Sequence, residues 1–249
     1  MNSSIKHVLD KGLVRLVDHM GNDLSVVRAA RVSYNADWRT GDEAGKDEKL
    51  IAYLIKNRHT SPFEAVTFTF EVKAPIFVFR QWHRHRTWSF NEVSARYSEL
   101  PEEFYVPELQ DITEQHSSNK QMRTSKQNEH ASLIRGYMQA AMTGAFDLYK
   151  ELLSLGCPRE LARGVLPCAT YSRMFATVDL HNLFHFLRLR LHEHAQKEIR
   201  VYAEAMLELV EPIVPYAVAA FKETTDDNVQ LLCAPCNLSK GSKTMEEWK

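Results

Sequence analysis

The stretch AVTFTFEVK at residues 65–73 constrains the fold more than any other part of the chain, because its apolar and polar side chains alternate without a break. Threonine, glutamate and lysine side chains would take one side of a strand, and valine and phenylalanine the other. The apolar set is Val66, Phe68, Phe70 and Val72. Strict alternation of this kind predicts a half-buried β-strand.

Helical and strand-like patterns are mixed along the rest of the chain without a regular β-α-β rhythm, which favours the α+β fold class. Further strands are predicted at 13–17 and 170–178. Helices are predicted at 24–33, 48–57, 76–83, 128–155, 158–166, 180–191, 194–210 and 216–223. We expect the polar residues 100–125 to form a long loop, and the end of the helix at 76–83 to direct His83 to Arg86 outward. One side of the helix at 128–155 is apolar, and it contains Leu133, Tyr137, Ala141, Leu148, Leu152 and Leu155.

Several short signals mark expected helix ends. Asp23 and Asp179 are predicted N-caps, because each precedes a helical pattern. Ser61 to Glu64 reads as a capping box with proline at the first helical position, so that free backbone N–H groups there could meet an anion. Gly156 is expected to end the helix at 128–155.

Charge and cysteine content limit the possible functions. The chain has 249 residues and a net charge of −1, whereas a protein that mainly grips nucleic acid is normally strongly basic. If Arg84, Arg86 and Arg96 bind an anion, we therefore expect a small phosphorylated one. We expect no membrane span and no signal peptide, and we read the four cysteines as reduced thiols of a cytoplasmic protein.

The stretch WHRHRTWSFNEVSARY at 82–97 is the strongest candidate for a site. On composition alone, an Arg/His cluster is as often a solvated face as a site. Here, however, aromatic residues alternate with the arginines, and solvated faces seldom carry so many of them. Arginine offers planar forked donors for phosphate or for the carbonyls of a heterocycle. Glu92 is the one acidic acceptor in the stretch.

The helix at 180–191 carries two stripes, the first of which is Leu180, Leu183, Leu187 and Leu191. The second is His181, His185, Arg188 and His192. Histidines four residues apart could ligate a metal, but no HExxH pattern and no nearby carboxylate completes such a site, so we predict none. Contact with a ligand, or partly buried histidines with satisfied hydrogen bonds, is the expected role. Arg190 is either an ion-pair partner or an arginine held in a cleft.

The motif Arg84-His85-Arg86, seven residues and then Ser94 resembles the signature of the flavin-dependent thymidylate synthases. Further segments resemble that family in the same order, and the resemblance covers about residues 8–222. They are NDLSVVRAARVSY, HTSPFEAVTFTF, APIFVFRQW, PRELARGVLP and LRLRLHEHAQKEI. The resemblance implies an α+β subunit with a mixed, mainly antiparallel sheet and long helices, in a homotetramer whose active sites are shared between subunits.

The implied reaction is the reductive methylation of dUMP to dTMP. Methylene-tetrahydrofolate supplies the carbon, NADPH reduces FAD, the flavin supplies the hydride, and tetrahydrofolate is released. The dUMP-binding residues implied by the resemblance are Gln81, Arg84, Glu92, Ser94, Ala95, Arg96, Arg163 and Arg190. The implied FAD-binding residues are Ser61, Arg84, His85, Arg86, Glu92, Asp179, His181 and His185. Arg190 matches the arginine credited with activating the uracil.

These roles agree with the chemistry. C5 of uracil must become a carbon nucleophile, and no cysteine lies in the ligand motifs to add at C6. A permanently charged arginine at N3 and O4 would instead stabilise the developing uracil anion. Ser94 lacks an evident paired base, so we expect it to donate a hydrogen bond rather than attack. Asp179, His181 and His185 replace Asn, Arg and Asn of some family members.

The C-terminal segment NVQLLCAPCNLSKG does not fit this family and resembles the end of HNH nuclease domains. Its Cys233 and Cys236 supply only half of a structural zinc site, which needs four ligands. We therefore divide the chain into a synthase domain at 1–223 and a non-catalytic HNH-like remnant at 224–249. The alternative function is that of a nucleic-acid-binding HNH-type protein, which the net charge and the incomplete zinc motif oppose.

Overall fold

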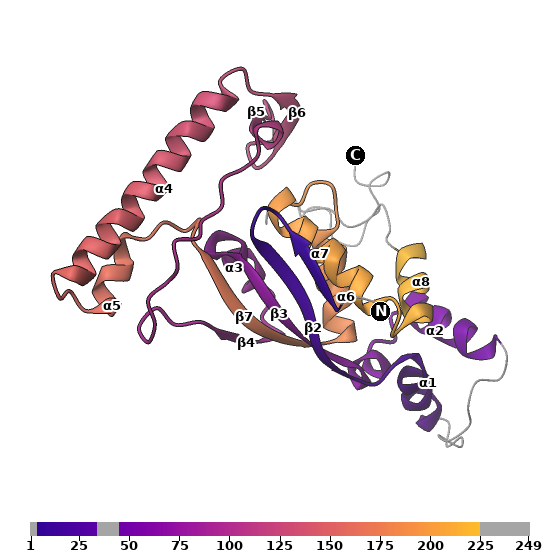
Figure 1. The fold of residues 1–249 in the computed structure, drawn as a ribbon. Coiled ribbons are helices and arrows are strands. Elements are labelled where there is room, and N and C mark those ends of the chain that lie inside the picture. The colour runs from indigo at the N-terminus through magenta and orange to yellow at the C-terminus, as the bar shows by residue number, and fades with distance from the viewer. Residues whose placement is uncertain (1–3, 34–44, 225–249) are drawn as a thin grey trace.

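The computed structural model describes residues 4–33 and 45–224, and the HNH-like segment with Cys233 and Cys236 lies outside them (Figure 1). A five-stranded sheet has the order β1-β2-β3-β7-β4, and every neighbouring pair is antiparallel. Its strands are β1 (Ile5–Val8), β2 (Gly12–Met20), β3 (Thr67–Pro75), β4 (Ser89–Glu92) and β7 (Tyr171–Asp179). Together with the helices, this arrangement confirms the α+β class. The strands predicted at 13–17, 65–73 and 170–178 are confirmed, whereas β1 and β4 were not predicted.

β3 is the central strand, and its two faces behave as the alternation predicts. Phe68, Phe70 and Val72 are fully buried in the main core. On the opposite face Glu71 lies between two arginines of neighbouring strands, 3.4 Å from Arg15 and 3.1 Å from Arg173. Because the ion pairs cross from β2 through β3 to β7, they support the register that the apolar face requires.

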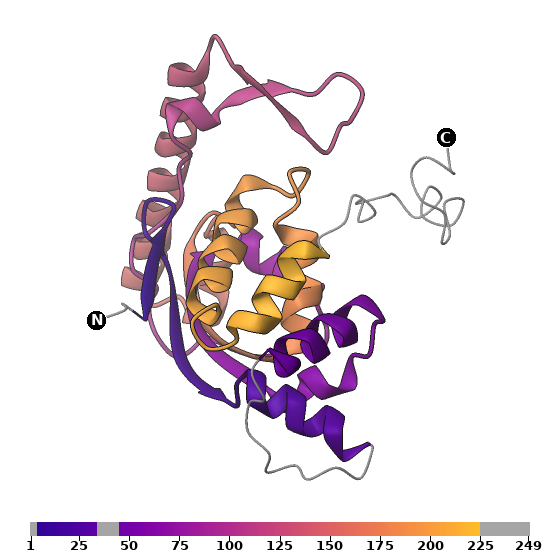
Figure 2. The same ribbon diagram turned by 90° about the vertical axis from the view of Figure 1, so that its right-hand side faces the viewer.

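Helices from distant parts of the chain contribute to one continuous core with the apolar face of the sheet. In Figure 2 α6, α7 and α8 lie together within the curve of the sheet, and α1 and α2 lie beside them. The helices are α1 (Asp23–Val32), α2 (Lys46–Lys56), α3 (Ile76–Trp82), α6 (Leu180–Arg190), α7 (Lys197–Val210) and α8 (Pro215–Glu223). Trp82 and Phe186 stack at the centre of this core with ring centroids 4.8 Å apart.

A helical arm extends away from the sheet and has its own small core (Figures 1 and 2). It contains β5 (Thr113–Gln115), β6 (Arg123–Gln127), α4 (Ala131–Ser154) and α5 (Arg159–Ala162). The prediction of a long loop at 100–125 was wrong, because β5 and the start of β6 pair there as a two-stranded sheet. The hairpin is tied to the main core by ion pairs from Arg123 to the buried Glu198, at 3.1 Å, and from Lys197 to Asp111.

The apolar stripe of α4 is largely uncovered within this chain. Leu133, Tyr137, Leu148 and Leu155 are all exposed, Tyr137 by 68%. The face that does pack against the arm's core carries Phe146 and other large side chains, namely Met138, Met142, Tyr149 and Leu153. The predicted helix is therefore confirmed, but most of the predicted apolar side faces outward. Gly156 ends the helix as predicted, with φ of +81°.

Two of the three predicted helix starts were wrong in detail. Asn22, not Asp23, caps α1, through a reciprocal capping box with Ser25. Asp23 instead accepts hydrogen bonds from the backbone of Tyr216 and Ala217 at the start of α8, at 2.8 and 3.1 Å. Ser61 opens a 3₁₀ turn at Ser61–Ala65, but no side chain caps it. The cap at Asp179 is confirmed, since its Oδ1 accepts from the N–H of Asn182 at 2.9 Å.

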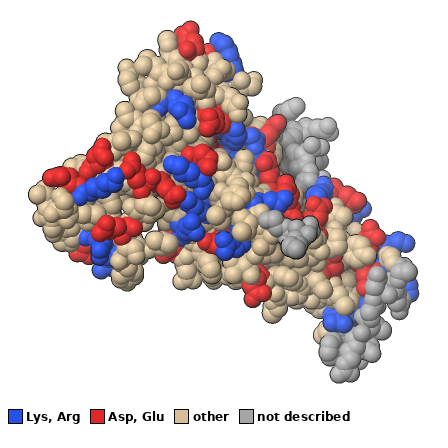
Figure 3. Space-filling model, viewed as in Figure 1, with Lys and Arg blue, Asp and Glu red and all other residues tan. Residues whose placement is uncertain are grey.

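The remaining regular elements are 3₁₀ turns at Leu109–Asp111 and Arg163–Val165. Positive and negative side chains are interspersed over the face shown in Figure 3. None of the helices among residues 4–33 and 45–224 is both long enough and apolar enough to cross a membrane.

Candidate active site

The stretch at 82–97 runs from the end of α3 into β4, and its aromatic residues anchor it. Trp82 and Trp88 are buried, and both pack against Phe186 of α6. The two arginines of the RHR motif, Arg84 and Arg86, are exposed. His85 between them is only 6% exposed, so the prediction that this whole segment points outward was wrong. Tryptophan packing therefore fixes the backbone from which the arginines project.

His85 is in contact with Arg190, the residue expected to activate the uracil. Nε of Arg190 donates to Nε2 of His85 at 3.0 Å, and Nη2 of Arg190 donates to the carbonyl of Gln81 at 3.3 Å. The side chain of Gln81 also bonds to Gln196, which precedes α7. Three residues assigned to the ligands by resemblance thus meet within one chain, although α3 and the end of α6 are far apart in sequence.

The protonation state of His85 matches its role as acceptor. Burial is the main cause that lowers the pKa of His85 from 6.5 to about 4, and the nearby Arg190 and His185 lower it further. The imidazole is therefore neutral near pH 7, with Nε2 free to accept when the proton is on Nδ1. Burial also lowers the pKa of Arg190, but a guanidinium stays charged at this pH. Within residues 4–33 and 45–224, this cation is thus held in place by neutral acceptors and not by a carboxylate.

A second group of predicted residues surrounds Glu160 at the start of α5. Nη2 of Arg96 is 3.5 Å from the carboxylate of Glu160, and Nε of Arg163 donates to the carbonyl of the same residue at 3.4 Å. Ser94 Oγ accepts from the N–H of Arg96 at 3.3 Å, and Ala95 is buried between them. The two arginines come from separate motifs, and the resemblance assigns both to dUMP. In the fold both contact the same residue, Glu160.

The other predicted residues are less concentrated. Glu92 accepts a hydrogen bond from Ser172 of β7 at 2.8 Å, while Ser61 lies at the start of its 3₁₀ turn. Asp179 uses both carboxylate oxygens on Asn182, at 2.9 and 2.6 Å, so its side chain is engaged in capping α6. No cluster of three or more His, Cys, Asp or Glu residues that could hold a metal occurs within the described part of the chain.

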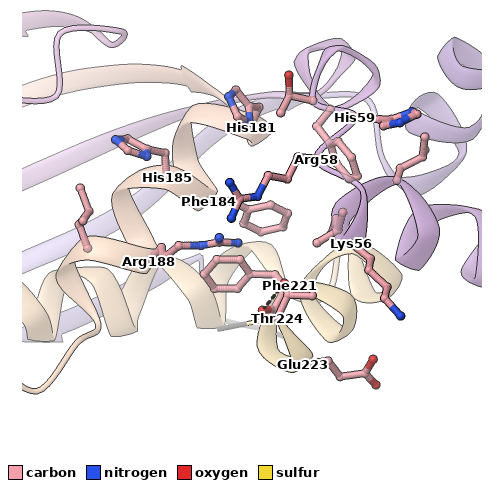
Figure 4. A pocket seen from close by; sticks show the side chains of 15 residues that line it. Lys56, Arg58, His59, His181, Phe184, His185, Arg188, Phe221, Glu223 and Thr224 are labelled. Carbon is pink, nitrogen blue, oxygen red and sulfur yellow. Dashed lines mark hydrogen bonds between the residues drawn. The ribbon is translucent and has the colours of Figure 1, made fainter. Parts of the chain in front are cut away.

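A cavity of about 730 Å³ opens beside α6, and His181 and His185 line it (Figure 4). Its apolar wall includes Phe184 and Phe221, whose rings stack with centroids 4.6 Å apart. The ring of His85 lies 6.0 Å from that of His185, which connects this cavity to the Arg190 group. Burial is the main cause that lowers the pKa of His185.

Sequence reasoning missed several residues of this cavity. It identified the histidine and Arg188 stripe on α6, but not the basic residues that follow α2 or the aromatic partner from α8. These are Lys56, Arg58, His59 and Phe221. Only the helical spacing at 180–191 carried a signal, because α2 and α8 are brought to α6 by tertiary packing. His192 of the same predicted stripe lies beyond the end of α6 and packs against His194.

The arginine-rich stretch and the cavity beside α6 suit an enzyme that binds a nucleotide, because arginine donors fit phosphate and aromatic rings fit a base. Residues 15–216 match the family model described as "Thymidylate synthase complementing protein". The chain is 50% identical over 228 residues to the flavin-dependent thymidylate synthase of Treponema denticola, covering 89% of this chain and 83% of that protein. It is 53% identical over 220 residues to an enzyme of the same name from Thermus thermophilus, covering 87% and 77%.

A solved structure gives the same result. The UMP/dUMP methylase PolB from Streptomyces cacaoi, bound with 5-Br dUMP, superposes with a TM-score of 0.79 and 39% identity. The match covers 88% of this chain and 97% of that one. The chain therefore belongs to the thymidylate synthase complementing protein family, the flavin-dependent thymidylate synthases, and the resemblance found in the sequence is confirmed.

Proposed function

We propose that this protein is a cytoplasmic flavin-dependent thymidylate synthase that converts dUMP to dTMP, with methylene-tetrahydrofolate as carbon donor and NADPH as reductant. The observation that carries this function is the family match over residues 15–216. The contact of Arg190 with Gln81 and His85 supports it, because two residues assigned to dUMP and one assigned to FAD, from separate motifs, meet in the fold. Tetrahydrofolate is the expected folate product.

The residues beside α6 fit FAD as the cofactor. The cavity is within the range of ligand sites, and it combines stacked phenylalanine rings with imidazole and guanidinium donors. Such a set suits a ligand that has both flat rings and a diphosphate. We assign His181 and His185 to FAD, together with the residues that the resemblance implies: Ser61, Arg84, His85, Arg86, Glu92 and Asp179. When bound, the flavin supplies the hydride.

Arg190 is the residue that we propose to activate the substrate. Its guanidinium is partly buried and held by His85 and the carbonyl of Gln81, so it would meet uracil N3 and O4 in a fixed orientation. The positive charge stabilises the anion that develops on the ring and raises electron density at C5. Gln81, Arg84, Glu92 and Ser94 to Arg96 would orient dUMP, with Arg163 joining Arg96 near the phosphate.

We propose that four copies of the chain assemble and share active sites. The exposed apolar stripe of α4 supports this assembly, since large exposed apolar patches commonly mark protein interfaces. Two glycines of α4, Gly136 and Gly144, have nothing within 4 Å of the place that a Cβ would occupy, so nothing within the described chain requires glycine there. A helix interior normally disfavours glycine. Close approach by another subunit would explain why both positions carry it.

The test of this function is tritium release from 5-tritiated dUMP, with FAD, NADPH and methylene-tetrahydrofolate supplied and then omitted in turn. We expect release and dTMP formation that need all of them. A folded, yellow protein that releases no tritium would contradict the activity but keep the flavin site. We expect residues 224–249, the HNH-like remnant, to be dispensable for turnover, so a chain ending at residue 223 should be equally active.

A further inference from the structure

The end of α2 is built in the same way as the end of α4, but with a different residue at the critical position. After α4, the N–H of Gly156 bonds to the carbonyl of Leu153 at 3.0 Å, and the N–H of Cys157 bonds to Leu152 at 2.9 Å. After α2, Arg58 and His59 make the same pair of bonds to Ile55 and Leu54, at 3.0 and 2.9 Å. Both ends are Schellman motifs.

A Schellman motif places one residue in the left-handed region, where glycine is favoured because it has no Cβ. Gly156 has φ of +81°, and Arg58 has φ of +57°. Among the described residues only Arg58 and Leu9 are non-glycine residues with positive φ. The backbone at Arg58 is therefore strained where glycine would relieve it, and strain of this kind concentrates at ligand-binding positions.

The side chain of Arg58 extends into the cavity beside α6. In Figure 4 its guanidinium lies next to Phe184 and near the guanidinium of Arg188, which lies over the Phe221 ring at 5.9 Å from the centroid. No hydrogen bond or ion pair joins the Arg58 guanidinium to any other described residue. Glu223, the one acid among the described residues that line the cavity, points away from it in Figure 4.

We infer that Arg58 binds an anionic oxygen group, a phosphate or a carboxylate, of a ligand in this cavity. The Arg58 guanidinium extends into a cavity walled by apolar rings (Figure 4) and has no hydrogen-bond or ion-pair partner among the described residues, so its donors are available to an anion. This inference rests on the proposed function, which offers two sources of such a group: the diphosphate of FAD and the glutamate carboxylates of the folate. An arginine fork suits both.

The decisive variant is Arg58→Gly, because the two roles of the residue predict opposite changes. Glycine removes the strain, so the melting temperature of the flavin-free protein should rise by about 2–4 °C. It also removes the donor, so affinity for the anion should fall by about ten- to a hundredfold. Arg58→Asn, which tolerates the left-handed region without carrying a charge, should behave similarly. Arg58→Lys should keep the strain and retain part of the affinity.

Gly156→Arg is the matched control, because it places arginine at the same position of the second Schellman motif. It should lower the melting temperature without changing the affinity for FAD. FAD affinity is measured by fluorescence quenching on flavin-free protein, and folate binding by the KM for methylene-tetrahydrofolate with one or five glutamates. A weaker FAD affinity in Arg58→Gly assigns the group to the diphosphate. A raised KM confined to the pentaglutamate assigns it to the carboxylates.

Unchanged values for both ligands in Arg58→Gly would overturn the inference, whether or not the protein is more stable. The flavin titration does not depend on turnover, so it separates this inference from the proposed function. If the wild-type protein binds FAD but releases no tritium, the activity fails, while the flavin titration still measures the role of Arg58 toward the diphosphate. If the wild-type protein binds neither FAD nor folate, both fail together.

Discussion

His85 connects Arg190 to the cavity beside α6, because its Nε2 accepts from Nε of Arg190 and its ring lies 6.0 Å from that of His185. A buried histidine beside an arginine is kept neutral by burial and by the positive charge, and only the neutral ring can accept from Nε of Arg190. A carboxylate in its place would form an ion pair and reduce the field that Arg190 can apply to a substrate. The middle residue of the RHR motif thus sets the orientation of the guanidinium while leaving its charge available.

Replacement of Arg190 should separate flavin binding from chemistry. In Arg190→Ala we expect the flavin content to stay near that of the wild type and tritium release to fall by about a hundred- to a thousandfold, because one preorganised donor to the developing anion is lost. Flavin content is read from the absorbance of the purified protein. Arg190→Lys keeps the charge but not the fork and should fall in between. Unaltered turnover in Arg190→Ala would defeat the proposed activation of uracil.

The lowered pKa of His85 also predicts a dependence of stability on pH. Below about pH 6.5 the unfolded chain binds a proton at this residue, whereas the folded protein resists it down to about pH 4. The free energy of unfolding should therefore fall as pH drops through this interval, by up to about 3 kcal/mol from this residue. Urea unfolding of the wild type and of His85→Gln, each at pH 7.5 and at pH 5, measures this effect. The part of the fall that His85 causes should be absent in His85→Gln. An equal fall in the free energy of unfolding between pH 7.5 and pH 5 in the two proteins would contradict this prediction.

Among the elements, α4 carries apolar residues that packing within a single chain does not explain. Only Ala131, Phe146 and Tyr149 of its 24 residues are buried. Its exposed apolar residues lie on the side away from the arm's own core, as helical spacing requires for two separate contact faces. One face holds the arm together, and the other is available to another subunit.

A charge placed on the exposed stripe should break the proposed assembly without unfolding the chain. Leu148→Glu would put a carboxylate at the proposed water-excluding interface, so we expect dimers or monomers in place of the proposed tetramer. Light scattering after gel filtration measures the mass, and circular dichroism checks that helix content is kept. Gln139→Glu, an exposed polar position of the same helix, is the control and should remain tetrameric. A tetrameric Leu148→Glu protein would show that the stripe is not the interface.

The elements that could be predicted from the sequence are those formed by interactions between residues close together in the chain. The β3 alternation, the leucine stripe of α6 and the Asp179 cap were predictable, because each depends on neighbours within a few residues. Asp23 was assigned to the wrong helix because its partners, the N–H groups of Tyr216 and Ala217, lie 193 and 194 residues further along the chain. The hairpin at 113–127 was not predicted, because its polar strands have no alternation of apolar and polar residues. No sequence pattern marks Arg58 as a candidate, because the property that distinguishes it is its positive backbone φ angle.

Within the whole molecule, the candidate residues fall into two groups that the described contacts do not join. One group is centred on Arg190 and His85, and the other on Arg96, Glu160 and Arg163. If active sites are shared between subunits, one subunit can supply the first group and its neighbour the second. A single chain would then hold two halves of different sites.

Sharing of this kind predicts complementation between two inactive variants. Arg190→Ala and Arg96→Ala should each be nearly inactive alone, but co-expressed with different affinity tags and purified through both, they should regain activity. With random mixing, roughly a quarter of the sites would contain both intact groups, and the tritium release should recover to about that fraction. The double variant Arg190→Ala/Arg96→Ala co-expressed with itself is the control. Mixed tetramers as inactive as their parents would place both groups in one subunit's site.

The strand order has a consequence for how the chain is made. β3 lies between β2 and β7, yet β7 is synthesised roughly a hundred residues after β3, which corresponds to about 5–20 s at ordinary rates of translation. Until then one edge of β3 has no partner, and Phe68 and Phe70 lack the covering helices that follow β7. During that interval the first half of the nascent chain has an open, apolar sheet edge, which is a template for pairing with other chains.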